Sequence, residues 1–253
     1  MNLNPLPPAI LFQDNDILVL NKPAGLVVDR SASQTAGTLQ DWLECQFPHQ
    51  KSIQRSGIVH RLDKETSGLL LVARNEMARV HLIEQFSSRA IQKVYVALLH
   101  GQLERERTVE GAIGRNPKNR EKFTVLSDGK DAITMFRPTK HFSFPLEKLK
   151  EWGIRLKPAF ASEYANVTLV EAFPKTGRTH QIRVHAQSIG HPVISDERYA
   201  GRKRSRIDRK WCPRLFLHAS TLTFLHPKTG ETMTFSADLP DILTFSLSIL
   251  LSK

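Results

Sequence analysis

The sequence predicts an α+β fold, and three observations support this. Apolar or alternating runs recur along the chain, as at Ile17–Leu20, Gly68–Ala73 and Gln92–His100, and such runs indicate strands. Other stretches carry apolar residues at the spacing of an amphipathic helix. Proline and glycine stand between these segments, where they mark turns. No internal repeat or low-complexity segment interrupts this pattern, so we expect an ordinary globular protein.

The first predicted elements are a β-hairpin and a short helix. Apolar runs at Ala9–Phe12 and Ile17–Leu20 flank a short polar stretch, which is the pattern of a hairpin. Proline and glycine within Asn21–Gly25 then turn the chain. A helix ending at Pro48 is predicted from apolar residues spaced i, i+3, i+4 and i+8, which are Leu39, Trp42, Leu43 and Phe47.

The stretch from Gly57 to Asn75 is the centre of the chain. It predicts a lead-in strand at Gly57–Val59, a polar turn at His60–Ser67 and a second strand at Gly68–Ala73. The second strand is apolar without alternation, so we expect it to be buried on both faces. Nearly every residue of the turn is charged or hydroxylic. A reactive loop held by a rigid apolar frame is the usual construction of a functional site.

Asp63 lies in this turn between Arg61 and Lys64. Cations within about 4–6 Å lower the pKa of a carboxylate and keep it ionised. An ionised, oriented carboxylate serves as a nucleophile, a base or a stabiliser of charge. The alternative is a turn aspartate that accepts hydrogen bonds from Thr66 or Ser67. Spacing alone leaves both interpretations open.

Strands and helices continue after the central stretch. A helical stripe is expected to anchor the next helix in the core, and its members are Met77, Val80, Ile83 and Phe86. The alternating segment Gln92–His100 predicts a strand with Tyr95 in its middle. A helix with one apolar face is predicted over Thr179–Ile189. Further strands are predicted at Lys130–Arg137, Tyr164–Phe173 and Leu215–Leu225.

Three segments are rich in cations. Gly111–Phe123 predicts an exposed basic hairpin tip suited to phosphate contacts, or else a solvated charged loop. Gly201–Lys210 carries six cations against one carboxylate, which indicates an RNA-binding tract. In the segment Pro138–Glu163, aromatic residues including Phe160 alternate with cations. That composition suits single-stranded RNA, although short insertions more often pack on the body of a protein.

The overall charge is strongly positive. The 253 residues include 36 Lys and Arg against 25 Asp and Glu, giving a net charge of +11 and a pI near 9.9. Such an excess favours a polyanion as partner, because phosphate binding releases counterions. The two cysteines form no paired motif, so neither a zinc knuckle nor a redox site is predicted. Low cysteine content fits a reducing compartment, and we expect a cytoplasmic protein.

No motif predicts a metal, a cofactor or a membrane anchor. The histidines lack the spacing of a zinc-binding helix, and no Gly-rich phosphate loop or dinucleotide fingerprint occurs. The apolar segment near the C-terminus is about half as long as a membrane span. We therefore expect no metal, no cofactor and no membrane contact, and we expect a monomer.

Several motifs resemble those of the RluA-type pseudouridine synthases, which isomerise uridine in ribosomal and transfer RNA. The central segment HRLDKETSGLLL carries the most specific resemblance. Other matching segments occur in the family's order, and together they cover roughly residues 10–240. The matching segments are Asn21–Leu26, His60–Leu71, Lys93–Ala97, Lys175–His185, Leu217–Ala219 and His226–Pro227. One departure is Ser195, which stands where the family usually has glycine.

The resemblance implies a fold and a domain organisation. It implies a mixed, mainly antiparallel central sheet, split by a basic catalytic cleft and with helices outside. We expect residues 1–253 to form a single catalytic domain with an insertion at about 138–163. Some members carry a small RNA-binding module before this domain, and too few residues precede Asn21 for such a module.

The resemblance also implies residue roles. Asp63 would attack the anomeric carbon or take a ribose proton, Arg183 would pair with Asp63, and Tyr95 would stack on the uracil. By themselves, Arg183 could equally be a surface arginine and Tyr95 a half-buried core residue. Arg61 would fill the space that the flipped base leaves, or hold the flipped backbone. The expected RNA-binding residues are His60, Arg61, Arg115, Lys118, Arg120, Arg178, His180, Arg202, Lys203 and Arg204.

The substrate is either large-subunit rRNA or tRNA. The residues of the central motif favour large-subunit rRNA. Two other classes of function also remain. One is an RNA-binding protein that has lost catalysis on the same scaffold. The other is a hydrolase with an aspartyl nucleophile, which would need a second carboxylate, and Glu65 is the nearest candidate.

Overall fold

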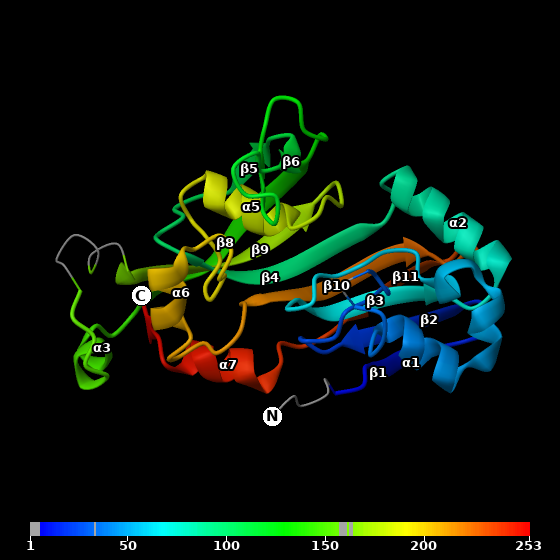
Figure 1. The fold of residues 1–253 in the computed structure, drawn as a ribbon, viewed down its shortest axis with the longest axis horizontal. Helices are drawn as coiled ribbons and strands as arrows, with labels where there is room; N and C mark the ends of the chain where they lie inside the picture. The colour runs from blue at the N-terminus through cyan, green and yellow to red at the C-terminus, as the bar shows by residue number, and fades with distance from the viewer. Residues whose placement is uncertain (1–5, 33, 157–160, 162–163) are drawn as a thin grey trace. The chain divides into compact units, whose positions relative to one another are not determined.

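The computed structural model describes residues 6–32, 34–156, 161 and 164–253. The chain forms two compact units, and each unit combines two separate stretches of the sequence (Figure 1). Unit 1 comprises Met1–Lys93 and His218–Asp238, and unit 2 comprises Val94–Leu217 and Leu239–Lys253. The single-domain organisation expected from the sequence stays a prediction.

Unit 1 is built on a sheet in the strand order β1-β2-β3-β10-β11. The pairs β1/β2, β2/β3 and β10/β11 are antiparallel, whereas β3 and β10 are parallel. The predicted N-terminal hairpin and the mixed, mainly antiparallel character are thus confirmed. The strands are β1 (Ala9–Gln13), β2 (Ile17–Lys22), β3 (Ser67–Ala73), β10 (Leu217–Leu225) and β11 (Thr232–Ser236).

Two helices and two short 3₁₀ turns accompany this sheet. Helix α1 (Leu39–Gln46) begins at a capping box, in which Thr38 and Asp41 satisfy each other's backbone N–H groups. The 3₁₀ turns η1 (Pro48–Ser52) and η2 (Gln54–Gly57) follow, and α2 (Glu76–Ser87) comes after β3. The predicted lead-in strand is wrong, because Gly57 belongs to η2 and Ile58 forms only an isolated bridge to Val72.

The core of unit 1 confirms the expectation for the central strand. Every residue of β3 is buried, so neither face of the strand meets solvent. Helix α2 packs on one face of the sheet through Ala78 and Leu82. The predicted anchoring stripe on α2 is wrong for Met77, Val80 and Ile83, which are 76%, 52% and 36% exposed, whereas Phe86 does pack against the core. Ala78 and Leu82, which are 1% and 0% exposed, occupy the buried side of the helix.

Unit 2 is built on an antiparallel sheet in which β9 lies between β4 and β8. Strands β5 and β12 pair with β8, and a separate hairpin is formed by β6 and β7. The hairpin confirms the predicted basic tip. The strands are β4 (Gln92–His100), β5 (Arg107–Glu110), β6 (Ile113–Arg115), β7 (Phe123–Val125), β8 (Ile133–Ser143), β9 (Asn166–Pro174) and β12 (Leu251–Ser252).

Strand β8 continues beyond Pro138, where the sequence predicted the insertion to begin. It stays paired with β9 as far as Ser143, with a register shift between Pro138 and Lys140. Helix α3 (Glu147–Glu151) follows. Phe142 and Phe144 are 5% and 2% exposed, so these rings pack in a core and are not available for stacking on RNA. Phe160 lies outside the described residues.

Helices cover both faces of the unit 2 sheet. Helix α5 (Gln181–Ser188) packs on one face through Ile182 and Ala186. Helices α6 (Arg202–Asp208) and α7 (Asp241–Ser248) pack on the other through Ile207 and Leu243. Across the described ranges, no helix combines the length and the apolar character that crossing a bilayer requires.

Candidate active site and RNA-binding residues

The turn that carries Asp63 is held by a buried lysine of unit 1. Lys22 is fully buried, and its Nζ donates to the carbonyl oxygens of Pro23, Leu26 and Lys64 at 2.8, 2.9 and 3.4 Å. The backbone N–H of Gly25 also donates to Lys64, at 2.7 Å. Two motifs that are distant in sequence are therefore joined beside Asp63, whose side chain is half-buried.

The end of the turn is fixed against β10. A Cβ on Gly68, whose φ is 112°, would lie 2.2 Å from the carbonyl oxygen of Ala219, so only glycine fits there. Ser67 Oγ lies 2.8 Å from Nδ1 of His218, and His218 Nε2 lies 3.1 Å from the carbonyl oxygen of Ala237. Because Nε2 faces an acceptor and carries the proton, Nδ1 accepts from Ser67.

His60 serves the frame of the turn. Its Nε2 accepts a hydrogen bond from the backbone N–H of Leu71 at 2.8 Å, and its ring stacks on Phe86 at 4.7 Å. Burial, reinforced by the nearby charge of Lys93, lowers the pKa of His60 to about 3. The ring is therefore neutral at pH 7. Its expected contact with RNA stays a prediction.

Arg61 pairs with an aspartate that sequence reasoning missed. Its Nη1 lies 3.3 Å from Oδ2 of Asp29, and its side chain is 64% exposed. The ion pair of Arg61 is thus with Asp29 and not with Asp63, beside which the sequence places it. No pattern in the sequence pointed to Asp29, which follows an apolar run.

Arg183 is a buried residue of α5 and not the surface arginine that remained an alternative. It is 3% exposed, and Asp196 is fully buried. Arg183 Nε donates to Asp196 Oδ2 at 2.7 Å, and Nη2 donates to Oδ1 at 2.9 Å. Asp196 Oδ1 also accepts from the backbone N–H groups of Arg198 and Tyr199, each at 3.0 Å. The arginine is thereby fixed by a bidentate ion pair.

Tyr199 connects Arg183 with two predicted RNA-binding residues. The Arg183 guanidinium lies over the Tyr199 ring at 5.1 Å, and the Tyr199 hydroxyl lies 2.8 Å from Nδ1 of His180. Phe123 donates its backbone N–H to the same hydroxyl at 3.1 Å, and Arg115 lies over the Phe123 ring at 5.2 Å. In unit 2, Arg183, His180 and Arg115 therefore lie around the rings of Tyr199 and Phe123. No pattern in the sequence pointed to Tyr199.

A buried polar cluster fixes the basic helix α6. Asp208, its last residue, is fully buried and accepts from the Tyr164 hydroxyl at 2.6 Å and from the Ser195 backbone N–H at 2.9 Å. His100 Nε2 lies 2.9 Å from the same carboxylate. Ser195 has a φ of 61°, the left-handed region that explains the family's preference for glycine there. The predicted basic tract is thus an anchored helix.

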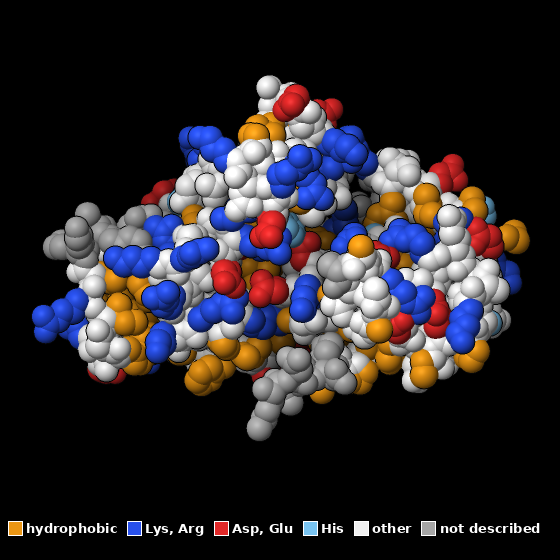
Figure 2. All heavy atoms as spheres, in the orientation of Figure 1, with side chains coloured by type: hydrophobic (Ala, Val, Ile, Leu, Met, Phe, Trp, Pro, Cys, Tyr) orange, Lys and Arg blue, Asp and Glu red, His pale blue; other side chains and the backbone are white. Residues whose placement is uncertain are grey.

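The expected RNA-binding residues of unit 2 differ in exposure. Arg115, Lys118, Arg120, Arg202 and Lys203 are exposed, whereas Arg178, His180 and Arg204 are half-buried. Arg178 Nε donates to the carbonyl oxygen of Asp131 at 3.0 Å, which fixes its side chain. Figure 2 shows Lys and Arg side chains over much of the face in view, with fewer acidic ones among them.

Tyr95 lies in β4 opposite Ala172 of β9 and is half-buried. It packs against the core that β4, β8, β9 and α5 share. Tyr95 and Arg183 both belong to unit 2, whereas Asp63 belongs to unit 1. The pairing of Asp63 with Arg183 therefore stays a prediction.

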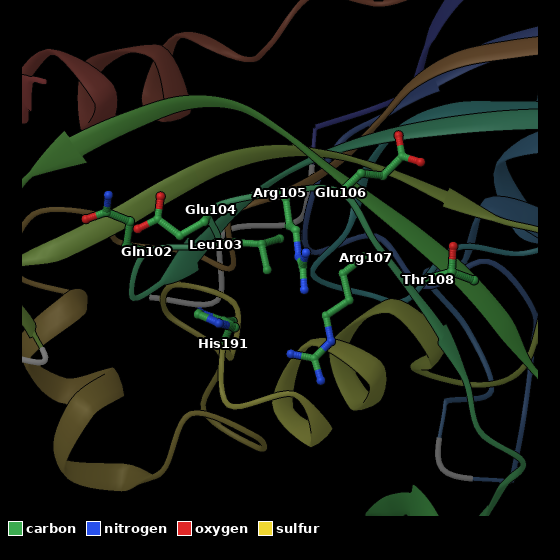
Figure 3. A pocket seen from close by; sticks show the side chains of 8 residues that line it. All are labelled: Gln102, Leu103, Glu104, Arg105, Glu106, Arg107, Thr108 and His191. Atoms are coloured by element: carbon green, nitrogen blue, oxygen red, sulfur yellow. The ribbon is translucent and has the colours of Figure 1, made fainter.

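Unit 2 contains a shallow hollow of about 720 Å³ that does not resemble a ligand pocket. It is lined mainly by the segment from Gln102 to Thr108, together with His191. Figure 3 shows Arg105 and Arg107 extending on the side where His191 lies, while Glu106 points away. Its lining carries charges of both signs and one aliphatic side chain, Leu103, unlike the mainly apolar lining of small-molecule sites.

One group of side chains in unit 1 has the composition of a metal site. The ligand atoms of Asp14, Asp16 and His226 lie within 4.8 Å of one another. Hydrogen bonds account for this grouping, because His226 Nε2 lies 2.9 Å from Asp14 Oδ2. Asp14 Oδ1 accepts from the backbone N–H groups of Asp16 and Ile17, each at 2.7 Å. The group closes the β1–β2 turn against the turn after β10.

Unit 1 presents Asp63 on a braced turn, and unit 2 holds a buried arginine among basic side chains; both features are expected of an RNA-modifying enzyme. The family described as RNA pseudouridylate synthase matches residues 16–188. The chain belongs to this family and is an RNA pseudouridine synthase, an isomerase.

Curated relatives agree over most of the chain. An uncharacterized RNA pseudouridine synthase, YlyB, of Bacillus subtilis is 38% identical over 94% of this chain and 71% of its own length. A ribosomal large subunit pseudouridine synthase D of Xanthomonas campestris is 36% identical over 97% of this chain and 70% of its own length. The chain spans 62% of the length of the enzyme of the same name from Neisseria meningitidis.

A solved structure also matches. The human RNA pseudouridylate synthase domain containing 1 has a TM-score of 0.71 and 28% identity, over 97% of this chain and 89% of that one. The expected fold class, α+β with a mainly antiparallel sheet, is therefore confirmed by a relative of known structure.

Proposed function

We propose that the protein isomerises uridine to pseudouridine in large-subunit ribosomal RNA. Relatives named ribosomal large subunit pseudouridine synthase D, 36% identical over 97% of this chain, support the choice of RNA. The observation that carries the chemistry is the buried Arg183–Asp196 ion pair. It fixes the guanidinium that the family resemblance pairs with Asp63.

The reaction requires an anion that is kept ionised and oriented. Asp63 is half-exposed on a turn braced by Lys22, so it is accessible to a substrate but restricted in position. A guanidinium has five N–H donors. Asp196 holds the Nε–Nη2 edge of Arg183, and we propose Asp63 as a further partner of the same guanidinium. Arg183 would thereby hold Asp63 as the ionised nucleophile or base.

The chemistry exchanges one bond of uracil for another. The bond from the ribose anomeric carbon to N1 breaks, the base turns, and the anomeric carbon bonds to C5. C5 loses its proton and N1 gains one, so no redox partner is needed. Asp63 would attack the anomeric carbon or remove a ribose proton. Tyr95 would stack on the base and assist the loss of the C5 proton.

RNA binding would use the exposed cations. The target base must leave its stack, which costs a few kcal/mol and less in a loop. Arg61 would support the RNA from which the base has left. Hairpin β6–β7 and helix α6 carry Arg115, Lys118, Arg120, Arg202 and Lys203 towards solvent, where phosphates would meet them. We further propose that the enzyme acts in the cytoplasm as a monomer and without a metal ion.

The test is tritium release from RNA labelled with [5-³H]uridine, because the C5 hydrogen is lost only when pseudouridine forms. Bacterial 23S rRNA and a tRNA pool are offered separately to the wild-type protein. We expect release from 23S rRNA, none from an Asp63→Asn variant, and wild-type release from Arg105→Gln, a change in the surface hollow. Mapping the product then locates the uridine.

Three outcomes would contradict the proposal. Release from tRNA alone would assign the other substrate class. RNA binding without release from any RNA would indicate a protein that has lost catalysis. Free uracil in the supernatant would indicate a hydrolase, in which half-buried Glu65 would be the nearest second carboxylate.

A further inference from the structure

Asp29 lies in the loop after β2, and its carboxylate faces two arginines of unit 1. Oδ1 accepts a hydrogen bond from Arg55 Nη2 at 2.5 Å, and Oδ2 lies 3.3 Å from Arg61 Nη1. The Asp29 side chain is 13% exposed, whereas that of Arg61 is 64% exposed. A nearly buried anion therefore anchors an arginine that is otherwise in solvent.

The Oδ2 atom of Asp29 depends on Arg61 for compensation. It is shielded from water and, within the described part of the chain, accepts no hydrogen bond of good geometry. A buried carboxylate oxygen without a donor is unfavourable. The Arg61 guanidinium at 3.3 Å supplies the opposite charge. The pair consequently favours one position of Arg61, although most exposed ion pairs add little to stability.

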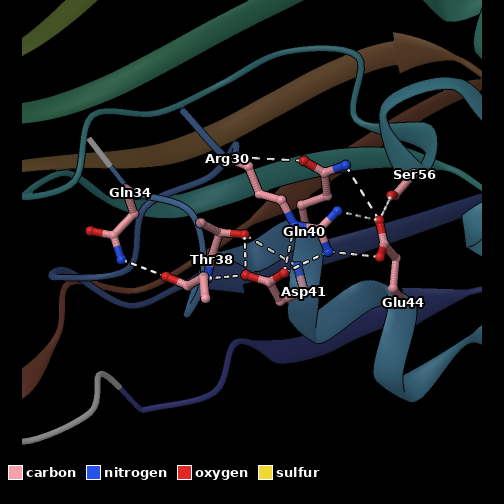
Figure 4. A network of polar contacts seen from close by, with 8 residues as sticks. Arg30, Gln34, Thr38, Gln40, Asp41, Glu44 and Ser56 are labelled. Carbon is pink, nitrogen blue, oxygen red and sulfur yellow. Dashed lines mark hydrogen bonds and ion pairs between the residues drawn. The ribbon is translucent and has the colours of Figure 1, made fainter. Parts of the chain in front are cut away.

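The neighbouring residue, Arg30, fixes the loop that carries Asp29. Its Nε donates to Asp41 at 2.7 Å, and its Nη1 and Nη2 donate to Glu44 at 3.1 and 2.7 Å (Figure 4). Ser56 Oγ donates to Glu44 at 2.6 Å. Hydrogen bonds from Arg30 and Ser56 lower the pKa of Glu44, so the network stays charged at neutral pH. Asp29 is therefore a fixed anchor.

The backbone before the Asp63 turn is fixed as well. Arg55 and Ser56 have φ values of 52° and 51°, followed by Gly57 at 78°. Gln50 Nε2 donates to the carbonyl oxygens of Ser56 and Ala73, each at 2.9 Å. Non-glycine residues in this region persist only where the surroundings over-determine them. In this strained turn, Arg55 contacts Oδ1 of Asp29, and Arg61 lies beside Oδ2 of the same carboxylate.

We propose that Asp29 is a positioning residue. Its ion pair holds the side chain of Arg61, which belongs to the same turn as Asp63, in one position before RNA binds. This rests on the proposed function, because Arg61 acts on the RNA. A guanidinium held by Asp29 is already in one conformation when RNA binds. A guanidinium that is not held must lose side-chain rotamer entropy in every turnover. A carboxylate also repels phosphates. The contribution of Asp29 therefore appears in the turnover rate and not in RNA affinity.

A double-mutant cycle tests this. Asp29→Asn, Arg61→Ala and the double variant are assayed by tritium release from 23S rRNA over a range of RNA concentrations. We expect Asp29→Asn to lower kcat about tenfold, with KM unchanged or lower. The double variant should turn over no more slowly than Arg61→Ala alone, because the two residues act as a unit. Glu76→Gln, which removes the charge of an exposed carboxylate paired with the half-buried Arg79 in the same unit, should match wild type.

A second readout requires no activity. Side-chain ¹⁵N NMR of Arg61, assigned with the Arg61→Lys variant, should show an ordered guanidinium in the wild type and a mobile one in Asp29→Asn. If Asp29→Asn does not fold, Asp29→Glu replaces it in both experiments, since it keeps the charge but moves it by one methylene. Three results would overturn the proposal. These are a wild-type kcat for Asp29→Asn, a kcat of the double variant lowered by the product of the two single losses, or an Arg61 side chain as ordered in Asp29→Asn as in the wild type. A wild-type protein that is inactive on every RNA but shows an ordered Arg61 would refute the proposed function alone.

Discussion

Arg183 and Asp196 form a buried bidentate ion pair, with Nε–Oδ2 and Nη2–Oδ1 distances of 2.7 and 2.9 Å. The pair joins helix α5 to the turn that follows it, and Tyr199 covers the guanidinium. Asp196 receives two further backbone hydrogen bonds, which fix its carboxylate. The orientation of Arg183 is therefore set by Asp196 before any substrate arrives.

Replacing Asp196 should damage stability and turnover to different degrees. Asp196→Ala removes the bidentate partner of the buried Arg183, and we expect a loss of about 3–5 kcal/mol in unfolding free energy. Asp196→Asn keeps the shape and one acceptor, so it should fold but lower kcat. Urea unfolding and tritium release measure the two effects. Glu197→Gln, next in sequence and in an exposed ion pair with Arg209, is the matched control. An Asp196→Asn variant with wild-type kcat would contradict this role.

Lys22 should be needed to hold the Asp63 turn. Lys22→Met removes the donor shared by three carbonyl oxygens, and losing the buried hydrogen bond to Leu26 costs about 1–3 kcal/mol. Because Lys64 is one of the three, the turn should also loosen and kcat should fall. Unfolding in urea and tritium release are measured against Lys51→Met, an exposed lysine of the same unit. Equal stability of the two variants would show that Lys22 is not a brace.

The sequence predicted the strands whose position follows from their own apolar or alternating residues. The fully apolar run at Gly68–Ala73 is buried on both faces, and strand β4 has the predicted bounds. The stripe on α2 misled because apolar spacing alone does not say which side of a helix meets the sheet. Ala78 and Leu82, which were not part of the predicted stripe, are the residues of α2 buried against the sheet.

The candidate site was predictable where a motif carries it and not where it depends on tertiary contacts. Asp63, Tyr95 and Arg183 follow from motifs. The Asp29–Arg61 and Arg183–Asp196 ion pairs do not, because only the folded chain brings these residues together. The left-handed turn before Asp63 likewise involves Arg55 and Ser56, residue types that give no signal for that conformation.

His60 should make stability fall with acid. Its pKa is about 3 in the folded state against an ordinary value near 6.5, so only the unfolded state takes up a proton between these values. Its contribution is complete above pH 6.5 and decreases as pH falls, by about 1.4 kcal/mol per pH unit. Urea unfolding from pH 7.5 to 5 should therefore show a shallower pH dependence for His60→Gln than for wild type. His49→Gln, an exposed histidine of the same unit, should leave the slope unchanged, and equal slopes for all three proteins would refute the assignment.

Helix α6 should contribute phosphate contacts that salt weakens. Arg202 and Lys203 are exposed on a helix anchored by the buried Asp208, so they are presented to solvent without ordering cost. Each phosphate contact contributes about 0.7–0.9 to the slope of log K against log salt. The Arg202→Gln/Lys203→Gln variant should thus bind 23S rRNA more weakly, with a slope reduced by about 1.5. Filter binding from 50 to 200 mM salt measures it, and Lys51→Gln/Lys228→Gln, with the same change in net charge on unit 1, controls for general charge. If both double variants lose the same slope, the effect belongs to net charge, and α6 is not a specific contact.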